Sequence, residues 1–400
     1  MTDISERALV RAASDSDAAP RRAIGPTTTA IPLDTVPAGD WRALAQRTLE
    51  PNGYYLPDWE LAVNASARGR TGVAVLCAYD DAPAPALIGL MPVTSLWRTY
   101  KLPLPALVSG HPYGTLCTPL LDRDMSDAAA TRLLQAARSS GAHALVLRDV
   151  AVDGVTMGAI ATALGRDGLR LRVLHDYKRA CLDATRDGDE VLQNALGSKK
   201  LKELRRQRHR LAEHGAVDFA VARSPADVAA ALETFLTLEA SGWKGHRGTA
   251  LIQHEGDAAF IRRATAALAL TNQCEIVTLR AGGAAIAAGI VLRHQGRAFF
   301  FKLGVDQRFA KYSPGVQLTL DLTRHLCADP AITSADSTAG PDHPMINPIW
   351  RGRFAVGDVL VPLYARDPVV EVVEMALRAR RSALDLIRRG MHVARGRRKA

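Results

Sequence analysis

A strand, a loop and a helix between residues 297 and 327 have the composition of an anion-binding site. RAFFFKLGV is an apolar, β-rich run, and PGVQLTLDLTRHLC has helical periodicity. A helix N-terminus presents unpaired N–H groups and the positive end of the helix dipole, so it attracts anions. A plain strand–turn–helix with a proline in its first turn is the alternative explanation. The residues predicted to hold the anion are Lys311, Ser313, Gly315 and Val316.

The segment ADSTAGPDHPMINPIW (335–350) carries the candidates for acid–base chemistry. Transfer of a group to an amine or a hydroxyl needs a base that takes the proton of the nucleophile, and a histidine or a carboxylate can do this. Asp336, Asp342 and His343 follow a short predicted strand at 332–337, so we predict that they are catalytic. All three residue types are also common in turns, and ordinary loop chemistry is the preferred alternative for His343.

The order of predicted elements occurs twice along the chain. Each half is expected to contain two helices, a three-strand meander, a helix, a strand, a further helix and a closing pair of strands. In the first half the closing strands are predicted near 169–176 and 179–184, and in the second half they lie within 353–363. Four hundred residues exceed one ordinary core, so two domains with tails are expected.

The formal net charge of +10 is concentrated in two segments. Ser198–Arg210 contains seven cations and one acid, and the predicted helix at 367–399 lies in a tail with ten cations and four acids. The remainder is close to neutral, which argues against a surface built for DNA. A solvated helix face is the default for the first segment, and an anionic partner (CoA 3′-phosphate, acidic glycan, tRNA or lipid headgroups) is the alternative. The tail is typical of a polybasic anchor to an anionic membrane.

The composition also predicts the compartment. Five widely spaced cysteines without a CxxC pair are typical of a reducing environment, and the N-terminus has no apolar core of signal-peptide length. No apolar run approaches the length of a membrane span. We therefore expect a cytoplasmic protein, with peripheral contact at the inner membrane as the alternative. Nucleophile-elbow, P-loop, zinc-protease and dinucleotide motifs are absent from the sequence, and no metal site is predicted.

Three stretches of the second half resemble a known family. SKKLKELRRQRHRLAEHG, FLTLEASGWKGHRGTAL and AGGAAIAAGIVLRHQGRAFFFKLGVDQRFAKYSPGVQLTLDLTRHL are similar to the CelD/BcsL-type acetyltransferase domain of the GNAT superfamily, which is named for bacterial cellulose and exopolysaccharide clusters. The chain is also similar to the Fem-type peptidyltransferases, which are tandem GNAT folds that use aminoacyl-tRNA. The resemblance covers roughly residues 190–350.

The resemblance implies an α/β fold (a mixed α+β sheet) of two tandem GNAT-like acyltransferase domains. It implies a disordered segment at 1–35, a degenerate domain at 36–188, a catalytic domain at 189–365 and a basic helix at 366–400. Acetyl-CoA or another acyl-CoA would be the co-substrate and would lie between strands 297–305 and 332–337. The backbone of 299–304 would polarise the acyl carbonyl as an oxyanion site.

The acceptor implied by the resemblance is a small molecule or a glycan with an amine or hydroxyl group. Trp243 and Lys244 lie near the acceptor site of GNAT folds, so they are predicted to bind substrate, although Trp243 also suits a core anchor. Glu239 is expected on the helix surface or as a cap. The phosphate motif is degenerate, because Lys311–Val316 keeps a cation and one glycine. A Fem-like aminoacyl-tRNA-dependent transferase and a non-catalytic scaffold of an envelope-assembly complex therefore remain alternatives.

Overall fold

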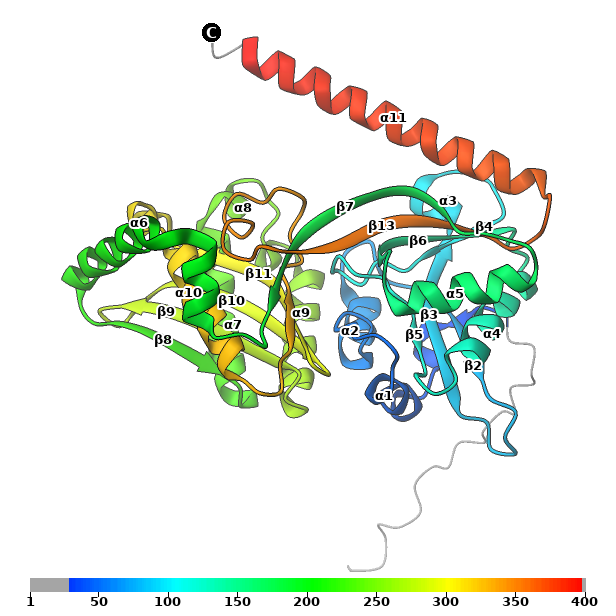
Figure 1. The fold of residues 1–400 in the computed structure, drawn as a ribbon, viewed down its shortest axis with the longest axis horizontal. Coiled ribbons are helices and arrows are strands. Elements are labelled where there is room, and N and C mark those ends of the chain that lie inside the picture. Colours follow the sequence, from blue (N-terminus) through cyan, green and yellow to red (C-terminus); the bar gives the residue numbers. More distant parts are fainter. Residues whose placement is uncertain (1–28, 398–400) are drawn as a thin grey trace, which may run out of the picture.

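The computed structural model describes residues 29–397, without the side chains of Trp243, Lys244 and residues 388–397. In this part of the chain thirteen strands form one mixed sheet that runs through the whole molecule (Figure 1). β5 (Leu120–Leu121) pairs with β3 beside the main path. The order along the sheet is β1 (Ile31–Pro32), β2 (Ala74–Tyr79), β3 (Leu87–Ser95), β4 (Ala106–Ser109), β6 (Ala144–Ala151), β13 (Gly352–Pro362), β7 (Arg172–Asp183), β12 (Ser334–Asp336), β11 (Arg297–Val305), β10 (Ala284–His294), β9 (Cys274–Ala281) and β8 (Val217–Ala222).

Both halves contain one parallel pair of strands in an otherwise antiparallel sheet. β4 pairs in parallel with β6 in the first half, and β11 pairs in parallel with β12 in the second half. Each pair is linked through a helix, as parallel strands require. The parallel pair after the meander is therefore repeated in both halves, but the further helix predicted before the closing strands is present only in the first half, at Val155–Arg166. In the second half the residues between β12 and β13 form turns and coil.

Helices cover both faces of each half. In the first half, α1 (Ala38–Gln46) and α2 (Pro57–Ser66) lie on one face, and α4 (Ser126–Ser139) and α5 (Val155–Arg166) lie on the other. In the second half, α7 (Pro225–Ser241) and α9 (Glu255–Leu270) lie on one face, and α6 (Gly188–Leu211) and α10 (Pro314–Ala328) lie on the other. The remaining helices are α3 (Leu96–Tyr100), α8 (Trp243–His246) and α11 (Pro368–Arg397).

Two long strands connect the halves. β13 comes from the end of the second half but pairs along its length with β6 and β7, while the end of β7 pairs with β12. The prediction of two closing strands in each half is therefore wrong, because one continuous strand occupies each place. The polar run at His175–Lys178 resembles a turn in sequence, but it bridges the halves as extended backbone paired with β13.

One apolar core is shared by both halves. The rings of Tyr54 and Trp59 from the first half contact Phe299, Phe301 and Phe260 from the second half, with centroids 4.9–5.7 Å apart for the three closer pairs. Aromatic pairs at this spacing contribute beyond their buried area. The two halves therefore pack as one interlocked body.

Local sequence explains the helix boundaries near the candidate site. Ser224 caps α7, because its side chain accepts a hydrogen bond from the Asp227 N–H, and Pro225 follows in the first turn. α6 bends at Gly197, whose φ of 70° is accessible to glycine, so the predicted basic helix begins at Ser198 after this kink. The disordered segment predicted for 1–35 lies outside the described residues as far as residue 28, whereas Ile31–Thr35 form β1 and a 3₁₀ turn with Leu33 buried.

Candidate functional site

The parallel strands of the second half separate after a short paired stretch. β11 pairs with β12 only from Arg297 to Phe299, opposite Ser334 to Asp336, and β11 then continues alone on that side to Val305. The Thr338 hydroxyl donates to the Phe300 carbonyl (2.7 Å) just beyond the separation. The strands predicted to flank the donor, 297–305 and 332–337, thus separate at this point, and Thr338 pairs with part of the edge that β11 leaves free.

Asp336 lies at the point of separation and connects the halves. It is 2% exposed and forms an ion pair with Arg179 of β7, which is fully buried. Its other oxygen accepts the Thr338 N–H (2.9 Å), and Arg179 also donates to the carbonyl (2.6 Å) and hydroxyl (2.9 Å) of Thr115. Both carboxylate oxygens therefore already have partners, so the pair joins β12 to the first half.

The other two predicted catalytic residues lie apart from Asp336. Asp342 is exposed with φ of 53°, and His343 is half-buried with a pKa lowered by burial. The Nδ1 atom of His343 accepts the Met345 N–H (3.4 Å). Within residues 29–397, no hydrogen bond or ion pair links Asp336, Asp342 and His343 to one another. Their catalytic roles stay predictions.

The predicted anion loop combines an exposed cation with a tightly packed glycine. Lys311 is exposed, with its ammonium 4.8 Å from the centre of the Tyr312 ring. Ser313 begins α10 in a left-handed conformation and makes no side-chain cap. A Cβ added at Gly315 would lie 3.0 Å from Leu303 Cδ2 and 3.2 Å from the Met345 sulfur. Gly315 therefore allows close packing of α10, and Val316 is half-buried beside it.

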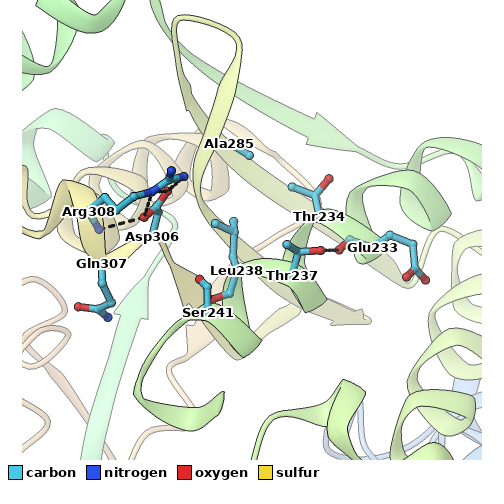
Figure 2. A pocket seen from close by; sticks show the side chains of 9 residues that line it. All are labelled: Glu233, Thr234, Thr237, Leu238, Ser241, Ala285, Asp306, Gln307 and Arg308. Atoms are coloured by element: carbon cyan, nitrogen blue, oxygen red, sulfur yellow. Dashed lines mark hydrogen bonds and ion pairs between the residues drawn. The ribbon is translucent and has the colours of Figure 1, made fainter. Parts of the chain in front are cut away.

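A groove of about 650 Å³ lies beside the start of this loop on the α7 face (Figure 2). Asp306 forms an ion pair with Arg308 (2.7 Å) at one end of the groove, and α7 supplies hydroxyl groups at the other. A groove of this size with few polar groups suits part of a flexible ligand. Its lining residues are Glu233, Thr234, Thr237, Leu238, Ser241, Ala285, Asp306, Gln307 and Arg308.

Lys302 and Glu239 form a functional candidate that the sequence analysis missed. Lys302 lies on β11 beyond the separation from β12, and its ammonium is 3.4 Å from Glu239 Oε1 on α7. The Glu239 side chain is 1% exposed and its second oxygen accepts the Leu251 N–H (2.9 Å), so the expectation of a surface position is wrong. The sequence signal was present in FFFKLG, where a lysine interrupts an apolar strand.

Side chains of the first half lie next to the Lys302–Glu239 pair. Tyr113 lies 5.7 Å from the Lys302 ammonium, measured to its ring centre, and its hydroxyl donates to Asp257 of α9 (2.9 Å). Burial, together with Asp257, raises the pKa of Tyr113. Arg70 lies over the same ring at 4.3 Å and donates to His111 Nδ1 (3.3 Å). Burial lowers the pKa of His111 to about 3, so this histidine is neutral at physiological pH.

A basic face lies on α6, which contacts α10 and the loop before it on the sheet face opposite to α7. Gln317 of α10 donates to the Leu204 carbonyl (2.8 Å), and Arg208 pairs with Asp321 (2.7 Å), so α6 is fixed against α10. Five other cations of α6 are exposed and have no ion pair within the described part of the chain. They share one side of the helix by their spacing. These are Lys199, Lys202, Arg205, Arg206 and Arg210.

Comparison with known proteins agrees with this geometry. Residues 198–343 match the model of the acetyltransferase (GNAT) domain. The second half carries a GNAT domain. No curated protein matches the chain at a significant level.

Three solved structures share the fold over most of their length. FemX is similar with a TM-score of 0.55 at 12% identity, over 85% of this chain and 98% of that chain. The C-terminal domain of a putative lysylphosphatidylglycerol synthetase from Agrobacterium fabrum has a TM-score of 0.51 at 12% identity, over 85% and 95%. A conserved protein of unknown function from Bacteroides thetaiotaomicron has a TM-score of 0.52 at 12% identity, over 82% and 98%. At these identities the likeness concerns the fold.

The predicted fold class, a mixed α/β fold of tandem GNAT-like domains, is therefore confirmed. In the GNAT domain, Trp243 and Lys244 lie on α8, and their side chains are outside the described part of the chain, so their role in substrate binding stays a prediction. Among the described residues, no group of three or more His, Cys, Asp or Glu side chains is arranged to hold a metal ion.

Proposed function

We propose that this chain is an acyltransferase that moves an acyl group from an activated donor to an amine or hydroxyl acceptor. The observation that carries the proposal is the Lys302–Glu239 pair, which lies on a GNAT domain beside the point where β11 and β12 separate. A half-buried lysine that is fixed by a buried carboxylate is a preorganised positive charge. Acyl transfer develops negative charge on the carbonyl oxygen of the donor, and such a charge stabilises it.

The proposed reaction is direct attack on the donor. The nucleophile forms a new C–N or C–O bond to the acyl carbon, the bond to the leaving sulfur or oxygen breaks, and the proton of the nucleophile goes to the leaving group. Lys302 stabilises the developing oxyanion, and Glu239 orients Lys302. The Arg179–Asp336 pair keeps the two halves in register around this site.

Acyl-CoA is the donor that we propose first. The loop from Asp306 to Val316 would hold its pyrophosphate, with Lys311 as the cation, and the neighbouring groove would hold a further part of the same molecule. The acceptor would enter from the side of α9 and Tyr113. A role in polysaccharide or cell-envelope biosynthesis is the finer proposal that follows from the resemblance.

An aminoacyl-tRNA donor is the second candidate, and the basic face of α6 favours it. Five cations along one helix face can bind a row of phosphates, as in tRNA. The similarity of the fold to FemX also supports an aminoacyl-tRNA donor. A lipid acceptor is a further option, because one protein that shares the fold is described as a putative lysylphosphatidylglycerol synthetase. The scaffold alternative predicts no turnover with any donor.

Turnover of the purified full chain with acyl-CoA and aminoacyl-tRNA, over a panel of amine and hydroxyl acceptors, tests the proposal. Lys302→Met is expected to lower kcat by about 100-fold and to leave donor affinity nearly unchanged, because the charge acts mainly in the transition state. Lys101→Met removes an exposed lysine of the first half and should leave kcat unchanged. Equal losses in both variants, or full activity of Lys302→Met, would overturn the proposed role of Lys302.

A further inference from the structure

The last helix, α11, has two different apolar sides. Near its start, Val370 and Val373 are buried against Leu96, Val108 and the other members of a small core under β4 and β6. Two ion pairs from Arg172 of β7 hold the same turn through Glu371 and Glu374 (2.7 and 2.6 Å). The beginning of α11 is therefore fixed to the first half.

The opposite side of α11 presents apolar side chains to solvent. Val372, Met375, Leu386 and Ile387 are 44%, 63%, 68% and 57% exposed. In a helix with 3.6 residues per turn these four positions fall on one side, and Ala379 and Ala383 lie between them on the same side. Figure 1 shows α11 running along the outside of the molecule. None of the helices in the described residues is long and apolar enough to cross a bilayer.

Charge accompanies this apolar side toward the C-terminus. The sequence after Ile387, RRGMHVARGRRKA, contains six cations and no acid. Two parallel copies of such a segment would repel each other, which disfavours pairing with a second copy of the chain. An apolar helix side that continues into a cationic segment instead complements a surface with anionic groups at its boundary with water and apolar groups below them.

We infer that α11 docks the protein on an anionic lipid bilayer. Leu386, Ile387 and Met375 enter the boundary between headgroups and acyl chains, and the positive charge of the sequence after Ile387 attracts the protein to anionic lipid. The Arg172 ion pairs fix the start of α11 to the first half, so α11 and the first half dock together. This inference is independent of the acyl-transfer proposal.

Co-sedimentation of the full chain with vesicles tests the inference. Vesicles of equal parts phosphatidylcholine and phosphatidylglycerol are expected to bind the protein at least about tenfold more strongly than vesicles of phosphatidylcholine alone, and added salt should weaken the binding. Leu386→Glu should reduce the binding by about tenfold, because it places a charge in the apolar side. Leu270→Glu is the matched control, since Leu270 is 74% exposed at the end of α9, away from α11.

The outcomes distinguish between the possible binding partners of α11. Loss of vesicle binding in Leu386→Glu with full binding of Leu270→Glu supports the inference. Equal binding to both vesicle types, no binding by the wild type, or equal losses in both variants would overturn it. A concentration-dependent dimer by light scattering that Leu386→Glu dissociates, without vesicle binding, would assign the helix to a second copy instead. Both leucines are exposed, so thermal unfolding of the variants should match the wild type.

Discussion

Breaking the ion pair between Arg179 and Asp336 should cost a large part of the stability of the chain. Asp336→Asn keeps an acceptor for the Thr338 N–H but leaves the buried Arg179 guanidinium without a counter-charge. Removing one partner of a buried pair typically costs about 3–5 kcal/mol. Because Arg179 keeps its two bonds to Thr115 while its Nε already has no partner, we expect a value of about 3 kcal/mol.

A double variant separates the charge effect from the loss of packing. Arg179→Met with Asp336→Leu removes both charges and fills the space with apolar groups, so its free energy of unfolding should lie within about 1 kcal/mol of the wild type. Arg179→Met alone leaves Asp336 unpaired and should be as unstable as Asp336→Asn. Urea unfolding followed by fluorescence and by circular dichroism measures all four proteins.

The same series tests the prediction that Asp336 is a catalytic base. Our account expects Asp336→Asn to lose stability and the double variant to regain it. If Asp336→Asn were within about 0.5 kcal/mol of the wild type and yet inactive with any donor, the structural interpretation would be refuted and the catalytic one favoured.

Two further predictions concern buried groups. Glu60 is buried without a hydrogen-bond partner for either oxygen, and burial raises its pKa well above the usual value. The folded state therefore favours the neutral carboxyl group, and the free energy of unfolding falls as rising pH removes its proton. Glu60→Gln should therefore raise the urea midpoint at pH 8 and change it little at pH 4, whereas the exposed Glu213→Gln should change neither. A Cβ at Gly304 would lie 2.9 Å from the Glu239 N–H nitrogen, so Gly304→Ala should cost about 1–3 kcal/mol by displacing α7. Gly39→Ala, which meets nothing within 4 Å, should not destabilise the chain in calorimetry.

Local patterns were sufficient for most of the fold. The strand β11 and the helix α10 were predicted within a residue, because an apolar β-rich run and a first-turn proline are short-range signals. The strand exchange was not predictable, because the pairing of β13 with β6 joins residues about two hundred positions apart. Only a contact between distant segments distinguishes this arrangement from two closed domains.

The candidate site was predicted in part. The family resemblance placed the donor between β11 and β12, where the structure shows the strands separating, but the partners of the residues there were not predicted. Asp336 looked like a strand-end base, and its partner Arg179 lies in a strand that was assigned to the other half. Lys302 and Glu239 looked like isolated charges in apolar elements, and only their approach across the β11–α7 interface makes them a pair.

Calorimetric titration of acyl-CoA and of aminoacyl-tRNA into the full chain tests the central claim most directly. The account predicts micromolar binding of one donor class, weakened at least about tenfold by Lys311→Glu and unchanged by the matched reversal Lys101→Glu in the first half. Binding of aminoacyl-tRNA alone, with a steep salt dependence, would retain acyl transfer and replace the donor. No binding of either donor, or equal weakening by both reversals, would contradict a donor site in the second half.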